Sequence, residues 1–123
     1  MFGKTKAISG FAVRDVDAAK KFYSDVLGLT VEDMPFGFQL HIEGGNPILV
    51  YGKPDHQPAN FTILNFPVAD VEAAVDALVE RGVEFLRYDG FGQDDKGIAR
   101  EGGPLIAWFA DPSGNIISVV AEQ

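Results

Sequence analysis

The chain has 123 residues, no cysteine, a formal net charge of −8 and a sequence pI of about 4.5. The absence of cysteine excludes disulfides, thiolate metal sites and a cysteine nucleophile, and the negative charge disfavours nucleic acid and favours a cationic ligand. The length suits one folded domain. No apolar run is long enough for a signal peptide or a membrane span, so we expect a cytoplasmic protein without a membrane partner.

The first predicted strand and the start of the first helix recur 55 residues later in the chain. The segment ISGFAVRDVDAA, which begins at Ile8, aligns without a gap with ILNFPVADVEAA, which begins at Ile63, and seven of the twelve positions are identical. In both copies alternating apolar residues predict a strand, and Asp15 or Asp70 stands where a helix N-cap belongs. The chain is therefore expected to contain an internal structural repeat.

A helix is predicted after each of these strands. Apolar residues at helical spacing predict helices over about Val16–Leu27 and Val71–Arg81. Gly28 and Gly82 follow at the positions where a glycine commonly ends a helix.

Three strand-like segments follow each predicted helix. They are Leu29–Met34, Phe36–Glu43 and Pro47–Gly52 in the first half, and Val83–Asp89, Pro104–Ala110 and Asn115–Val120 in the second. The glycine-rich turns GGNP and DPSGN suit hairpin connections. The sequence thus predicts an α+β fold with two βαβββ modules in a single domain covering 1–123, residues 1 to about 56 and about 57 to 123, joined by the linker YGKPDHQPAN.

The segments FYSDVLGL, DVEAAVDALVERGVEF and DPSGN, in this order, resemble the vicinal oxygen chelate superfamily. This group includes glyoxalase I, extradiol dioxygenases, fosfomycin-modifying enzymes and bleomycin-resistance proteins, and the resemblance covers essentially the whole chain. It implies mixed sheets that curl around a central cavity, commonly in a homodimer. It also implies, for the enzymes of the family, a divalent metal held by four side chains of His, Gln or Glu.

Carried onto this chain, the four metal-ligand positions of the family are Ile8, Leu49, Ile63 and Ser118. The first three have no donor atom, and one neutral hydroxyl cannot hold a divalent cation. We therefore expect no metal and no other cofactor. The resemblance then points to the branch of the family in which a dimer binds and sequesters an aromatic or cationic compound without converting it.

The expected cavity is lined by small, apolar side chains with a few polar ones. Trp108 and the glycine-flanked loop RYDGFG are candidates for its rim or lid. Trp108 also suits ordinary core packing. The predicted ligand-binding residues are His41, Tyr51, Asn65, Tyr88, Phe91, Trp108 and Ser118. His56 is expected to be a solvated linker residue. The acidic loop around Asp89, Asp94 and Asp95 is either solvated or a source of counter-charge for a cationic ligand.

Three functions stay open at this point. The first is a metal-independent protein that binds and sequesters a small molecule. The second is a metal-independent isomerase or lyase that uses His41, Tyr51 or Tyr88 as an acid or base. The third is a structural or regulatory dimer with a vestigial cavity. The ligand positions disfavour a divalent-metal-dependent lyase or dioxygenase, and Ser118 lacks the sequence context of a hydrolase nucleophile.

Overall fold

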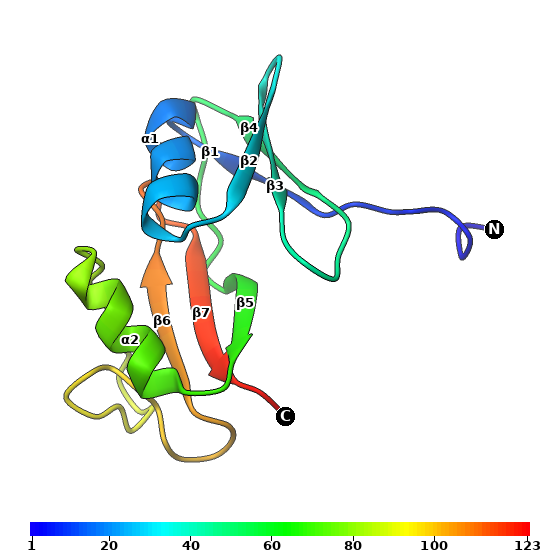
Figure 1. Cartoon of the computed structure of the whole chain (residues 1–123). Coiled ribbons are helices and arrows are strands. Elements are labelled where there is room, and N and C mark those ends of the chain that lie inside the picture. The colour runs from blue at the N-terminus through cyan, green and yellow to red at the C-terminus, as the bar shows by residue number, and fades with distance from the viewer. The chain divides into compact units, whose positions relative to one another are not determined.

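The repeat in the sequence corresponds to two structural units, each with one sheet and one helical segment (Figure 1). The computed structural model describes all residues, 1–123, and divides into Met1–Gln57 and Pro58–Gln123. The sheets have four and three strands and both are mixed, which confirms the predicted α+β class. No helix combines the length and apolar character that a membrane crossing needs.

The first unit is built around a four-stranded sheet in the order β1-β4-β3-β2, in which only β1 and β4 run parallel. Its elements are β1 (Gly10–Val13), α1 (Val16–Lys21), the π-helical turn η1 (Phe22–Val26), β2 (Thr30–Met34), β3 (Gly37–His41) and β4 (Ile48–Gly52). Tyr23 of η1 is fully buried, and its ring lies 5.8 Å from that of Phe11 and 6.3 Å from that of Phe38. The helical segment thus covers the face of the sheet that carries Phe11 and Phe38.

The first helix differs from the prediction, because α1 gives way to the π-helical turn after Lys21. The Leu27 amide donates to the Phe22 carbonyl, five residues back, at 3.1 Å. The Ser24 hydroxyl donates to the Lys20 carbonyl at 2.7 Å and so competes with the backbone amide that would bond this carbonyl in an α-helix. A local side-chain bond of this kind is not visible in the apolar spacing.

The second unit has a three-stranded sheet in the order β5-β7-β6, in which β5 and β7 run parallel and β6 and β7 antiparallel. Its elements are β5 (Thr62–Val68), α2 (Val71–Glu80), β6 (Ile106–Ala110) and β7 (Ile116–Ala121). Val75 of α2 is buried, as are Phe109 and Ile117, which lie on one face of the sheet. As predicted, Asp15 and Asp70 cap α1 and α2 by accepting from the amides three residues on.

The predicted strand Val83–Asp89 is wrong. This segment makes one isolated bridge to β6, between Phe85 and Phe109, and one further bond from the Leu86 amide to the Trp108 carbonyl. Beyond it the side chain of Gln93 takes the backbone groups that would continue a ladder, because it bonds the Leu86 carbonyl and the Tyr88 amide. The chain therefore leaves the sheet edge as a loop.

The strands that open and close each repeat pair in equivalent register. Gly10 of β1 lies opposite Leu49 of β4, and Asn65, 55 residues after Gly10, lies opposite Ser118 of β7. This pairing confirms the predicted equivalence of Leu49 and Ser118.

The DPSGN turn sets the start of β7. The buried Asp111 carboxylate accepts from the amides of Ser113 and Asn115 at 2.9 and 3.0 Å and from the Asn115 side chain at 2.9 Å. Gly114 has φ of +89°, a left-handed conformation that glycine adopts without steric cost. These contacts fix which residues of β7 face each side of the sheet.

Candidate functional site

Three aromatic side chains named from the sequence form one cluster in the second unit. Trp108 projects from β6, and Tyr88 and Phe91 come from the loop between α2 and β6. The ring centroids of Phe91 and Trp108 lie 5.3 Å apart, those of Tyr88 and Trp108 5.5 Å and those of Tyr88 and Phe91 5.7 Å. These tilted and edge-on arrangements are the geometries that aromatic pairs prefer, so the cluster is a packed wall.

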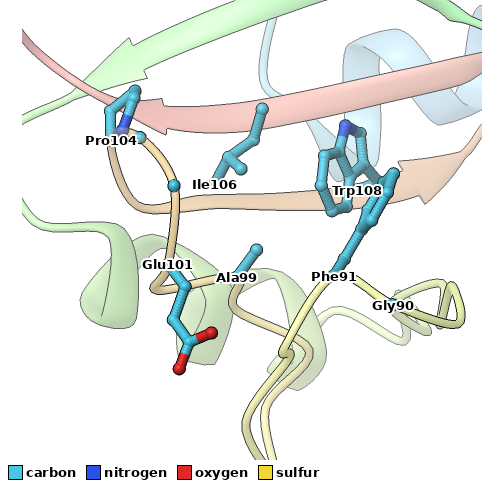
Figure 2. A pocket seen from close by; sticks show the side chains of 9 residues that line it. Gly90, Phe91, Ala99, Glu101, Pro104, Ile106 and Trp108 are labelled. Carbon is cyan, nitrogen blue, oxygen red and sulfur yellow. The ribbon is translucent and has the colours of Figure 1, made fainter.

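Two members of the cluster, Phe91 and Trp108, line a cavity of about 600 Å³. Its lining residues are Gly90, Phe91, Ala99, Glu101, Gly102, Gly103, Pro104, Ile106 and Trp108. In Figure 2 Phe91 and Trp108 lie against each other at one end, Pro104 lies at the other, and Ile106 stands between them. Phe91 is 49% exposed, so part of an apolar ring faces solvent in the free protein. The volume is within the range of small-molecule sites.

Glu101 is the only charged residue in this lining. Its carboxylate points away from Ile106 and Trp108 in Figure 2 and lies next to the backbone of Gly92. The side chains of Phe91, Trp108, Ile106 and Pro104 thus form an aromatic and apolar part of the lining, and three glycines contribute polar backbone groups.

Gln93 shapes the loop that carries Tyr88 and Phe91. Its side-chain oxygen accepts from the Tyr88 amide at 2.6 Å, and its side-chain nitrogen donates to the carbonyls of Leu86 and Gly97, each at 2.8 Å. One side chain thus closes both ends of the loop and holds its two aromatic residues toward Trp108. Sequence reasoning missed this role, because a glutamine in a polar loop carries no distinctive signal.

Asp94 is the second residue whose side chain holds the loop through several hydrogen bonds. Its carboxylate accepts from the amides of Lys96 and Ile98, each at 2.9 Å, and from Nε of Arg100 at 2.7 Å. Desolvation opposes ionisation, but the bonds from the Ile98 amide, Arg100 and the Lys96 amide together outweigh it, so the pKa of this carboxyl is lowered.

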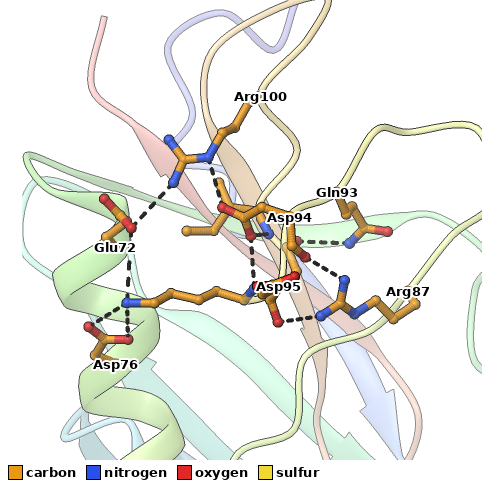
Figure 3. A network of polar contacts seen from close by, with 10 residues as sticks. Glu72, Asp76, Arg87, Gln93, Asp94, Asp95 and Arg100 are labelled. Carbon is orange, nitrogen blue, oxygen red and sulfur yellow. Dashed lines mark hydrogen bonds and ion pairs between the residues drawn. The ribbon is translucent and has the colours of Figure 1, made fainter.

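The network continues to α2 through ion pairs (Figure 3). Arg100 lies 3.3 Å from the Glu72 carboxylate, and Nζ of Lys96 lies 2.9 Å from that of Asp76. The guanidinium of Arg87 donates to the backbone carbonyls of Asp94 and Asp95. Asp94 was predicted to be either solvated or a counter-charge for a ligand. Its side chain is 27% exposed, and its oxygens accept hydrogen bonds within the chain.

Asn65 and Ser118 lie in the same unit as the aromatic cluster. Ser118 stands opposite Trp108 on one side and opposite Asn65 on the other, so these three residues form a row across β6, β7 and β5. Ser118 is fully buried, and its hydroxyl donates to the Asn65 side-chain oxygen at 2.5 Å. Five of the seven predicted site residues thus belong to one continuous region of the second unit.

His41 and Tyr51 belong to the first unit. His41 lies on β3, and its Nε2 lies 2.8 Å from a carboxylate oxygen of Glu32 on the neighbouring β2. Tyr51 lies on β4 and is 38% exposed. The two residues share one face of the sheet, since Tyr51 is opposite Gly37 and the side chains of β3 alternate.

The residues at the family's metal-ligand positions do not fit a divalent cation. Ile8 lies ahead of β1, and Ile63 lies where the register of β5 shifts. Leu49 has no donor atom, and the Ser118 hydroxyl donates its hydrogen to Asn65. Nowhere in the chain do three or more His, Cys, Asp or Glu side chains gather in a way that could hold a metal ion.

His56 is buried, with 7% of its surface exposed, and the prediction of a solvated linker residue is wrong. Its carbonyl accepts from the guanidinium of Arg14 at 2.9 Å, and its amide donates to the Lys53 carbonyl at 2.9 Å. These bonds hold the linker against the first unit, an arrangement that proline-rich composition does not reveal.

Comparison with known proteins identifies relatives of this architecture. The family model of the Glyoxalase/Bleomycin resistance protein/Dioxygenase superfamily matches residues 7–119. The structure of TnmS3, an antibiotic binding protein from Streptomyces sp. CB03234, is 26% identical, with 98% of each chain covered and a TM-score of 0.65. A glyoxalase family protein from Enterococcus faecalis is 21% identical, with 98% of this chain and 99% of that one covered and a TM-score of 0.70.

The fosfomycin resistance protein FosX from Listeria monocytogenes shares the fold at 14% identity, with 95% of this chain and 92% of that one covered and a TM-score of 0.70. No curated protein sequence matches this chain.

Proposed function

Because the chain belongs to the Glyoxalase/Bleomycin resistance protein/Dioxygenase superfamily, we propose that it binds a planar aromatic small molecule and holds it without converting it. The site is the cavity of the second unit. TnmS3, whose sequence is 26% identical over nearly the whole length of both chains, is an antibiotic binding protein, and this supports an antibiotic-like ligand.

The observation that carries the proposal is the aromatic wall of the cavity. Phe91 and Trp108 offer ring surface to a cavity of about 600 Å³ whose other walls include Ile106 and Pro104. Burying apolar ligand surface here gains about 25 cal/mol per Å², and stacking on an aromatic ring adds about 0.5–1.5 kcal/mol. A flat aromatic compound gains from both contributions.

Metal independence is part of the proposal and is supported by the donor set. Three of the family's four ligand positions hold aliphatic side chains, and the fourth holds a buried hydroxyl whose hydrogen is already bonded. A Lewis-acid step of the family type therefore has no residues to hold its metal.

A binding assay with matched variants tests this function. Trp108 is the only tryptophan in the chain, so its fluorescence reports directly on the cavity. We expect planar aromatic compounds to quench it saturably, and Phe91→Ala to weaken binding about tenfold, which corresponds to about 1.4 kcal/mol. Phe36→Ala, which truncates an exposed phenylalanine of the first unit, is the control and should leave affinity unchanged.

The fate of the ligand separates holding from catalysis. Native mass spectrometry should show a planar aromatic compound bound to the protein. The same compound should be recovered unchanged after incubation with the protein. Turnover, or a metal bound in stoichiometric amount, would contradict the proposal.

A second candidate function, a metal-independent isomerase or lyase, is favoured by the His41 and Glu32 pair. A carboxylate bonded to an imidazole fixes the orientation of the ring, as general-base catalysis requires. Under this alternative, turnover persists in a chelator and is lost in His41→Ala. Glu32→Gln would lower the rate.

We also propose that the protein is a cytoplasmic homodimer. In each unit the helix covers one face of the sheet, and the other face carries exposed side chains such as Tyr51 and Asn65. Light scattering at micromolar concentration should give twice the monomer mass of 13.3 kDa, and the monomer mass would contradict the dimer.

A further inference from the structure

The row formed by Trp108, Ser118 and Asn65 continues from the aromatic wall across the sheet. Adjacent strands lie about 4.8 Å apart, so Asn65 stands about 10 Å from Trp108 on the same face. A ring system of two or three fused rings has about this length. The lining of the cavity includes β6 but no residue of β7 or β5, so a ligand stacked on Trp108 reaches Asn65 by extending beyond the cavity across β7.

The Ser118 hydroxyl fixes how the Asn65 amide is turned. Ser118 is fully buried, and the Asn65 oxygen is the acceptor of its hydrogen at 2.5 Å. If the amide were flipped, its nitrogen would donate to the hydroxyl oxygen instead, and the buried hydroxyl hydrogen would lose the Asn65 oxygen as its acceptor, which is unfavourable. The oxygen of Asn65 is thus held toward β7, and the nitrogen faces away from Ser118.

The nitrogen of the Asn65 amide is free to donate to a ligand. Asn65 is exposed, and no group of the chain accepts from its side-chain nitrogen. The equivalent pair in the first repeat, Gly10 and Leu49, has no polar side chain at all, although its strands pair in the same register. The fold therefore does not require a polar pair at this place.

We propose that Asn65 is the polar anchor of the site and donates a hydrogen bond to an acceptor on the aromatic ligand. The ligand class is then a planar aromatic compound with a carbonyl or similar acceptor at its far edge. Ser118 is a positioning residue that acts through Asn65 and does not touch the ligand. This assignment rests on the proposed function, since it assumes that the aromatic ring occupies the cavity beside Trp108.

Two probes of the same shape test the assignment. One is 2-acetyl-7-(aminomethyl)fluorene, whose carbonyl lies at the end of the ring system away from the ammonium group. The other is 2-isopropenyl-7-(aminomethyl)fluorene, in which a =CH2 group replaces the carbonyl oxygen. Both carry an ammonium group for solubility, and quenching of Trp108 fluorescence gives their dissociation constants. In the unmodified protein the ketone should bind about tenfold more tightly, the effect of one hydrogen bond with a buried acceptor.

Asn65→Asp is the decisive variant, because a carboxylate still accepts from Ser118 but has no hydrogen to donate. It should abolish the preference for the ketone. Gln123→Glu adds the same charge at an exposed residue of the C-terminus and should keep the preference. Ser118→Ala should reduce the preference to about threefold, because the amide is then free to turn.

The outcomes separate this assignment from the function on which it rests. Loss of the ketone preference in Asn65→Asp alone supports the assignment. Equal binding of both probes by the unmodified protein, or a preference that survives in Asn65→Asp, overturns it and leaves the aromatic site intact. If neither probe quenches Trp108 fluorescence, the proposed aromatic site fails, and the role of Asn65 fails with it.

Discussion

Replacing Gln93 by alanine tests whether one side chain holds the aromatic wall in place. The variant removes three hydrogen bonds, to the Tyr88 amide and to the carbonyls of Leu86 and Gly97. Such bonds contribute about 1 kcal/mol each, but Gln93 is half-buried, and water can replace part of what is lost. We therefore expect the free energy of unfolding to fall by about 2 kcal/mol.

Two measurements check this value. Urea denaturation gives the change in the free energy of unfolding, and amide hydrogen exchange at Tyr88 reports on the loop itself, because that amide loses its acceptor. Asp89→Ala, in the same loop at an exposed residue, is the control and should change stability by less than about 0.5 kcal/mol. If Gln93→Ala matches this control and the Tyr88 amide exchanges at its original rate, the loop is held by something else.

Three further predictions concern Asp94, the two helix caps and the buried Tyr23. The pKa of Asp94 is lowered below the 3.8 of an unperturbed aspartate, so its ionised form stabilises the loop above pH 3.8. Hydrogen exchange should show that the protection of the loop amides is lost as the pH falls through the lowered pKa. Asp94→Asn should remove this pH dependence. Asp15→Ala and Asp70→Ala each remove a helix cap and should lower the free energy of unfolding in urea by about 1 kcal/mol, whereas equal stability to the parent protein would contradict the capping role. Tyr23→Ala empties a fully buried site and should cost about 3–5 kcal/mol in the same assay, and a loss below about 1 kcal/mol would show that the site collapses.

Local chemistry decided which parts of the fold could be predicted. The N-caps at Asp15 and Asp70, the left-handed glycines that end the helices and the buried Asp111 of the DPSGN turn all act within a few residues, so their sequence patterns are sufficient. The segment Val83–Asp89 has the alternation of a strand, but Gln93 captures its backbone groups from outside the segment. A competing partner of this kind is visible only in three dimensions.

The candidate site was predictable in its residue types and less so in its grouping. Glycine-flanked aromatic residues pointed to Tyr88 and Phe91, and their contact with Trp108 required the loop to fold back on β6. The partner of His41 was not predicted. Glu32 lies two residues from the position directly opposite His41, so the pair depends on the exact register of β2 and β3.

The two repeats differ most informatively at one pair of equivalent positions. Both use a parallel pair of strands in the same register, with Gly10 opposite Leu49 in one and Asn65 opposite Ser118 in the other. A buried hydroxyl that must find an acceptor is a less favourable choice for stability than leucine, and the first repeat shows that the fold is formed without it. The polar pair also lies beside the only tryptophan, in the repeat that carries the aromatic loop. The role in ligand contact that we propose for Asn65 would account for both features together.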